Sequence, residues 1–135
     1  MLFRSGIAPP PISVLNDHGK LTQPASQCLE VIARHDMILA TGHLGRNEIY
    51  ALVRAAKEMN LRKVIVTHAE FPSQNLSAAE QKELAGIGAI IEHCVTTMYT
   101  GKASWETAFA AIRATGCDRT LISTDLGQPD RKSVV

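Results

Sequence analysis

The sequence predicts an α/β fold built from parallel βα repeats. Apolar runs of strand length alternate with amphipathic runs of helix length along most of the 135 residues. The strand-like runs are apolar at successive positions, which is typical of strands covered on both faces of a parallel sheet. Right-handed crossovers place a helix over each pair of such strands, so the alternation favours this architecture over an antiparallel one.

The expected elements follow in order along the chain. Residues 12–21 (ISVLNDHGKL) predict a short hairpin around Asn16 to Gly19, and residues 24–35 predict a helix with Pro24 in its first turn. The expected strands cover residues 36–43, 63–68, 89–94 and 119–127. The expected helices cover residues 47–59, 77–88 and 104–116.

Local signals fix the ends of these helices. Asn60 suits the left-handed conformation that ends the first of the three. Ser77 and Glu80 have the spacing of a capping box, in which each side chain accepts from the other residue's backbone N–H. Ser104 is the expected cap of the last helix, and Gly116 ends it. The segment 95–103 is expected to be a loop.

Composition limits the classes of partner. Fourteen Lys and Arg against thirteen Asp and Glu give a net charge of +1 with interspersed signs, so we expect no nucleic-acid or lipid partner and instead a small-molecule substrate. No C-x-x-C pair occurs among Cys28, Cys94 and Cys117, which we interpret as reduced thiols. No apolar run has the length of a membrane span, and the first residues lack a signal peptide, so we expect a cytoplasmic protein.

Ionisable residues recur where the predicted strands end. His43, His68 and His93 are spaced 25 residues apart, and Asp125 ends the fourth strand. Neighbouring strands in a sheet lie about 4.8 Å apart, so side chains at consecutive carboxyl ends can meet in one small volume. In parallel barrels this rim carries the active site. We therefore expect the four residues to form one site.

Side-chain alternation along the strands predicts that these four residues point in a common direction, together with Leu39, Val64, Ile91 and Leu121. Imidazoles and a carboxylate gathered in one place suit a divalent metal, Zn²⁺ first and Mn²⁺, Fe²⁺ or Ni²⁺ as alternatives. The ordinary alternatives are hydrogen-bonded structural histidines and an aspartate that caps a turn.

Further polar residues border the expected site. Alternation sends Glu92 toward the helices, where an unpaired carboxylate would be costly to bury, so either Glu92 or His93 is expected to be the functional residue of that strand. Thr67, Glu70 and Glu92 are expected to bind substrate or to support the ligands. Cys94 is interpreted as a small buried hydrophobic residue.

The segments "TGHLGRNE", "VIVTHAEFP", "GAIIEHC" and "LISTDLGQP" resemble the C-terminal half of an uncharacterised amidohydrolase-like family in the metal-dependent hydrolase superfamily, over roughly residues 12–129. This resemblance implies about four strands of a (β/α)₈ barrel whose complete form binds one or two metal ions. It implies a histidine ligand on each of strands five and six, which correspond to His43 and His68, and an aspartate on strand eight, which corresponds to Asp125. His93 would fall on strand seven.

The resemblance also implies a reaction. Metal-activated water would hydrolyse an amide, ester, lactone or phosphoester, and Asp125 would shuttle the proton. The family pattern includes an H-x-H motif on strand one and a bridging lysine or carboxylate on strand four, and this sequence contains neither. We therefore expect the isolated chain to be impaired or inactive.

Both termini carry a signal of another kind. Residues 2–5 (LFRS) and 130–135 (DRKSVV) can be encoded by codons that contain inverted copies of one another, as an adapter flanking an insert would. We expect residues 1–5 and 130–135 to be non-native and residues 6–129 to form a partial barrel domain.

Two other interpretations stay open at this point. A non-catalytic βα domain could bind a small anion or a metal, or associate as a homo-oligomer through exposed sheet edges. A flavodoxin-like open sheet would bind its ligand at a topological switch point instead of a ring of histidines.

Overall fold

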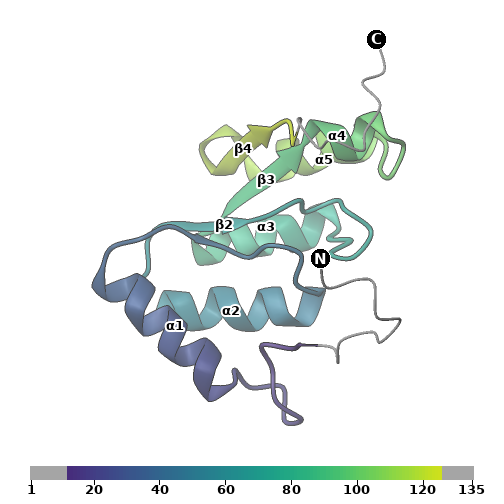
Figure 1. The fold of residues 1–135 in the computed structure, drawn as a ribbon. Coiled ribbons are helices and arrows are strands. Elements are labelled where there is room, and N and C mark those ends of the chain that lie inside the picture. Colours follow the sequence, from purple (N-terminus) through teal and green to yellow (C-terminus); the bar gives the residue numbers. More distant parts are fainter. Residues whose placement is uncertain (1–11, 126–135) are drawn as a thin grey trace.

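A computed structural model of the protein describes residues 12–125 (Figure 1). Its four strands form one parallel sheet in the order β1-β2-β3-β4. The strands are β1 (Leu39–Ala40), β2 (Val64–Val66), β3 (Ile90–Cys94) and β4 (Thr120–Ser123). The helices are α1 (Gln23–Arg34), α2 (Arg46–Glu58), α3 (Ala78–Ile87), α4 (Val95–Tyr99), α5 (Trp105–Thr115) and the 3₁₀ turn Cys117–Arg119. The predicted fold class, parallel βα repeats consistent with half of a βα barrel, is confirmed.

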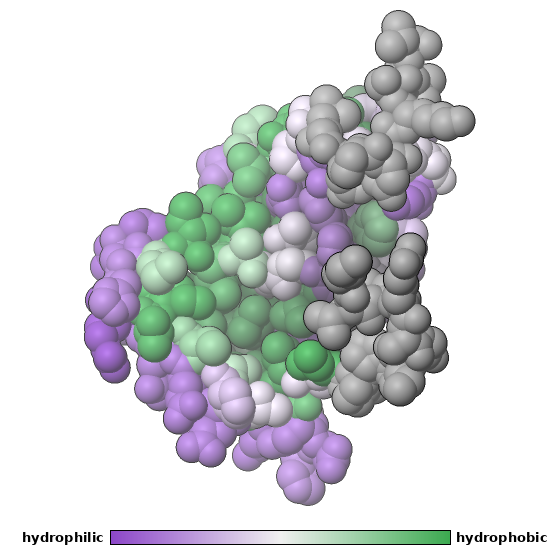
Figure 2. All heavy atoms as spheres, viewed as in Figure 1, coloured by the Kyte–Doolittle hydropathy of each residue, from purple (hydrophilic) through white to green (hydrophobic). Residues whose placement is uncertain are grey.

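The two faces of the sheet differ in what covers them. Leu39 pairs with Val64, and both are buried in the core that α2 and α3 cover, together with Val66 and Ile91. We call this side the helix face. The other side, the open face, carries Ala40, Ile65 and Ile90 in register, and they are exposed or only partly buried. Figure 2, which has the orientation of Figure 1, shows apolar surface in green across the middle of the molecule.

The register between β3 and β4 corrects the predicted side-chain direction. Glu92 pairs with Leu121 and Cys94 pairs with Ser123, whereas His93 pairs with Ile122. Paired residues in a sheet point to the same side, so Glu92 and Cys94 lie on the open face and His93 lies on the helix face. The prediction that Leu121 shares a face with His93 is therefore wrong.

The predicted helix ends are confirmed in detail. Ser77 Oγ accepts from the N–H of Glu80, and a Glu80 carboxylate oxygen accepts from the N–H of Ser77 at 2.8 Å. Asn60 has a φ of 58°, a conformation that asparagine adopts more readily than most residues. Ser104 caps α5, and Gly116 follows it with a φ of 87°.

The N-terminal hairpin is reduced to one antiparallel bridge between Leu15 and Leu21. Glu48, in the first turn of α2, holds this segment in place, because its carboxylate accepts from Ser13 Oγ at 2.7 Å and from the N–H of Val14 at 3.1 Å. Its second oxygen accepts from the N–H of Gly45. Burial alone would raise the pKa of Glu48, and these three hydrogen bonds outweigh it and lower the pKa.

Two features depart from the expectations. Residues 95–99 form the short helix α4 instead of a loop. The first strand is shorter than predicted, because Gly42 turns away with a φ of 60° directly after Thr41 donates its N–H to Ile65 O. The segments predicted to be non-native, 1–5 and 130–135, lie outside the described residues. Within residues 12–125, no helix is both long and apolar enough to cross a bilayer.

Candidate functional site

The carboxyl ends of three neighbouring strands bring together His68, Cys94 and Asp125. One ligand atom from each residue lies within 4.8 Å of the other two. Cys94 is buried, and the other two residues are partly buried. An imidazole nitrogen, a sulfur and a carboxylate oxygen at this spacing form a group that could hold a metal ion.

An unusual backbone conformation places two of the three side chains. His68 and Asp125 both have a φ of 49°. Left-handed backbone at residues other than glycine costs of the order of 1–3 kcal/mol and is concentrated at functional sites. In continued extended backbone, His68 would follow Val64 and Val66 onto the helix face. The left-handed turn at His68 instead lets it join Cys94 and Asp125.

His68 has an unsatisfied nitrogen. Its backbone N–H donates to Glu92 Oε2 at 3.2 Å, and its Nδ1 lies 3.5 Å from the same oxygen. That separation makes no proper hydrogen bond, so Nδ1 is a buried nitrogen without a hydrogen-bond partner among residues 12–125. The His68 imidazole lies close to a thiol and a carboxylate and has an unsatisfied nitrogen, which fits the binding of a divalent cation.

The Cys94 thiol is held by a chain of hydrogen bonds. Cys94 Sγ lies 2.9 Å from Thr96 Oγ1, and Thr96 Oγ1 donates its single proton to Thr124 O at 2.8 Å. The thiol must therefore be the donor to Thr96. Cys94 is buried as expected, but its place beside His68 was missed. Residues two apart on a strand point to the same side, so placing Glu92 on the open face would also have placed Cys94 on that face, where His68 lies.

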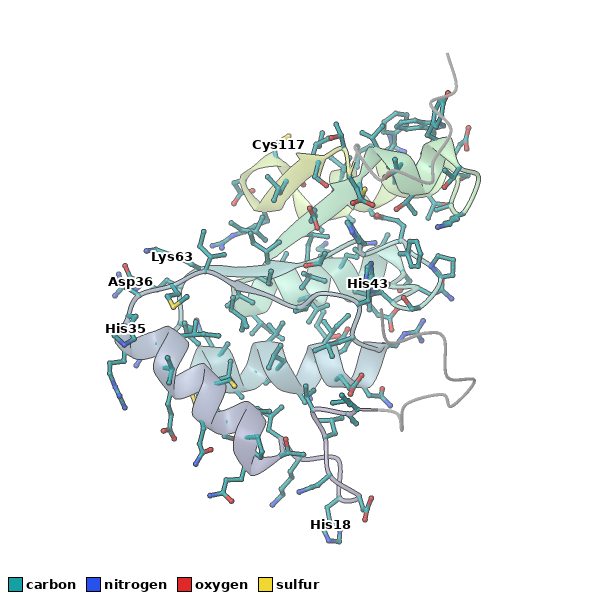
Figure 3. All side chains as sticks on the ribbon, in the orientation of Figure 1. His18, His35, Asp36, His43, Lys63 and Cys117 are labelled. Atoms are coloured by element: carbon teal, nitrogen blue, oxygen red, sulfur yellow. The ribbon has the colours of Figure 1, made fainter. Side chains whose placement is uncertain are left out.

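His43 lies next to His68, outside the three-residue group. The centroids of the two rings are 5.1 Å apart, and the His43 ring is 5.4 Å from that of Phe71. Figure 3 shows His43 at the end of the sheet opposite to Asp36 and Lys63. His43 is exposed. The structure thus brings His43 and His68 together, as expected, but leaves His43 at the rim.

His93 lies elsewhere. Its Nδ1 is 2.7 Å from Glu70 Oε1, and each side chain is only 1% exposed. Gln81 Nε2 donates to the same oxygen at 3.0 Å. A carboxylate oxygen accepts both bonds, which makes His93 Nδ1 the donor. The prediction that His93 points in the same direction as His68 and Asp125 is wrong, because strand alternation puts it on the helix face. Glu92 and Cys94 are instead the β3 residues that lie beside His68.

Thr67 joins the ends of the first two strands. Its Oγ1 accepts from the N–H of Gly42 at 3.2 Å, and its own N–H donates to Thr41 Oγ1 at 3.0 Å. These bonds fix the turn that leads to His43. Of the three supporting residues that the sequence suggested, Thr67 and Glu92 contact the backbone around the site, and Glu70 contacts His93.

Comparison with known proteins identifies a family for most of the chain. The model of a family of unknown function, DUF6282, matches residues 4–92. The matched segment includes His43 and His68 and ends before Cys94 and Asp125. No curated protein and no solved structure matches the chain.

Proposed function

The chain belongs to DUF6282, a family of unknown function, and we propose that it carries part of a metal-dependent hydrolase site in which His68, Cys94 and Asp125 hold a divalent cation. One observation carries the proposal. One ligand atom from each of these residues lies within 4.8 Å of the other two.

The donor set favours Zn²⁺ among the divalent metals. Zinc is of borderline softness and binds nitrogen, sulfur and oxygen ligands together, whereas Mg²⁺ and Ca²⁺ prefer oxygen alone. Three protein ligands with one position left for water are typical of catalytic zinc sites. Fe²⁺ and Ni²⁺ are the alternatives that accept the same ligands, and Mn²⁺ fits a thiolate less well.

The proposed reaction is the hydrolysis of a small-molecule amide, ester, lactone or phosphoester. A bound cation would polarise the scissile oxygen and lower the pKa of water at the site. Asp125 is the proposed ligand or general base, since its carboxylate lies among the ligand atoms. We propose that His43, which is exposed at the rim beside His68, contacts substrate.

We propose that the activity belongs to a longer protein with one or two metal ions. The ligands that the amidohydrolase resemblance assigns to strands one and four are missing from this sequence, so this chain is expected to turn over substrate weakly or not at all. Metal-dependent hydrolysis by the purified chain that disappears in Asp125→Ala would contradict the expected incapacity.

The metal site itself is tested by binding. Purified protein is titrated with Co²⁺, a spectroscopic substitute for Zn²⁺, and its metal content is measured by elemental analysis after dialysis against Zn²⁺. We expect one equivalent, a thiolate-to-cobalt absorption band, and loss of both in Cys94→Ser and His68→Asn. His18→Asn, the same exchange at an exposed histidine, should bind normally. An absent band and no bound metal in the unaltered protein would refute the proposal.

A second function, association of copies, is favoured by the open face. Ile38 is 61% exposed and Leu121 is 38% exposed, and within the described part of the chain the edge strands β1 and β4 each have one neighbour. Exposed apolar surface and unpaired strand edges promote association. Light scattering tests this alternative, and a monomer at high concentration would contradict it.

A further inference from the structure

We propose that Glu70 and His93 form a buried positioning pair that sets the spacing between His68 and Cys94. The role rests on the proposed metal site, because His68 and Cys94 are two of its ligands. Both members of the pair are 1% exposed, so neither reaches solvent or substrate. Their effect must therefore pass through the backbone that carries the ligands.

The pair joins the two segments that supply the ligands. Glu70 follows His68 by two residues in the turn after β2, and this turn is closed by the N–H of Phe71 donating to His68 O at 2.8 Å. His93 directly precedes Cys94 in β3. The 2.7 Å contact between Glu70 and His93 thus links the turn of one ligand to the strand of the other.

Three successive cross-links fasten the turn to the strand. The His68 N–H donates to Glu92 Oε2, and the Ala69 N–H donates to Glu92 O, at 3.2 Å each. The Glu70–His93 contact is the third, and it is the shortest and the most buried of the three. Short hydrogen bonds are stronger than long ones, and burial strengthens them further, so we infer that this link contributes most to holding the turn against β3.

Helix α3 fixes the carboxylate from the other side. Gln81 Nε2 donates to Glu70 Oε1 at 3.0 Å and to Leu76 O at 2.9 Å, and Gln81 is fully buried. Among residues 12–125, Glu70 Oε2 has no hydrogen-bond partner, so the carboxylate depends on the two donors to Oε1, Gln81 and His93. Leaving a buried carboxylate unpaired is costly, and His93 is one of the few groups that pair with it. The positions of Glu70 and His93 are therefore coupled.

The test separates this role from general stability by comparing three variants. His93→Leu removes the donor, and His93→Asn keeps an N–H near the position of Nδ1. The double variant Glu70→Met/His93→Leu removes both polar groups without leaving a lone buried charge, so it is the variant expected to remain folded. His18→Asn again serves as the matched control.

Amide hydrogen exchange measures the link without any metal. The Ala69 and His68 amides should exchange at least about tenfold faster in the double variant, relative to the Leu39 and Thr41 amides, which donate to Lys63 O and Ile65 O between β1 and β2. His93→Asn should restore most of the protection. Equal acceleration at all four amides would mean a merely structural role and would overturn the proposal.

Cobalt affinity measures the consequence for the ligands. Supporting residues around metal sites typically change affinity by about 10–100-fold, and we expect a loss in this range for the double variant and a smaller one for His93→Asn. Unchanged affinity in the folded double variant would also overturn the proposal. If the unaltered protein binds no cobalt while the Ala69 amide still responds selectively, the metal site is refuted and the positioning of His68 against Cys94 is retained.

Discussion

Cys94 donates its thiol proton to Thr96, because the Thr96 hydroxyl has already given its only proton to the carbonyl of Thr124. The contact spans 2.9 Å between sulfur and oxygen and is buried. It links the end of β3 through α4 to the residue that precedes Asp125. Two of the three proposed ligands are therefore connected by one side chain.

Thr96→Val should destabilise the protein. The change removes the acceptor of the Cys94 thiol and leaves Thr124 O without this donor, and an unsatisfied buried group costs about 1–3 kcal/mol. Chemical denaturation gives the free energy of unfolding. Thr96→Ser keeps the hydroxyl and should lose much less, so equal losses in the two variants would contradict the hydrogen-bonded chain.

Zinc should stabilise the folded protein. A ligand that binds only the native state at a hundred times its Kd adds about 2.7 kcal/mol to the free energy of unfolding. The thermal midpoint should rise with zinc and fall back when a chelator removes it. The rise should weaken as the pH is lowered, because protons compete for the thiolate and the imidazole. A rise of the same size in a Cys94→Ser/Asp125→Asn variant would show that the zinc binds elsewhere.

Ser77→Ala should lower stability by about 1 kcal/mol at neutral pH, the typical value of a helix N-cap. Side-chain and backbone hydrogen bonds from Ser77 lower the pKa of Glu80 below its ordinary 4.5, so the charged carboxylate is favoured in the folded state. That contribution is present above about pH 4.5 and is lost as the pH falls through the lowered pKa. Denaturation at several pH values should therefore show the difference from the unaltered protein narrowing in acid. Ser77→Thr keeps the cap and should show little change in the free energy of unfolding at any pH. If the loss in Ser77→Ala instead grew in acid, the assigned role of the Ser77–Glu80 hydrogen bonds would be contradicted.

Ile38→Lys should reduce association if copies meet through the open face. The substitution places a charge on the apolar end of that face, where Ile38 is 61% exposed. Light scattering over a range of concentrations measures the apparent mass. Val31→Lys is the comparison, because Val31 is also an exposed apolar residue but lies on α1. If the protein associates and Ile38→Lys leaves its apparent mass unchanged, the copies must meet through another surface.

The fold was predictable because its signals are local. The capping pair Ser77 and Glu80 and the terminating residues Asn60 and Gly116 specify helix ends without reference to the rest of the chain. The apolar runs specify strands, and the intervening helices require them to be parallel. Helix α4 was missed because its five residues carry neither a capping side chain nor a recognisable periodic pattern.

The site was predictable only in part, since it depends on non-local register. Counting along each strand assumed extended backbone to its end, and the left-handed conformation of His68 breaks that assumption. Nothing in a single strand reveals that β4 pairs with β3 so that Ser123 meets Cys94. The choice between Glu92 and His93 depended on this pairing.

Successive residues of β3 point to opposite sides of the sheet, so the register of β3 decides which of its residues supplies a ligand. Deleting one residue ahead of Ile91, so that β3 shifts by one position against both β2 and β4, would exchange the two sides. The thiol would then be turned under the helices and the imidazole of His93 outward, which converts a sulfur-containing site into one made of nitrogen and oxygen donors. A one-residue shift in register would thus alter the preferred metal without a substitution at any site residue.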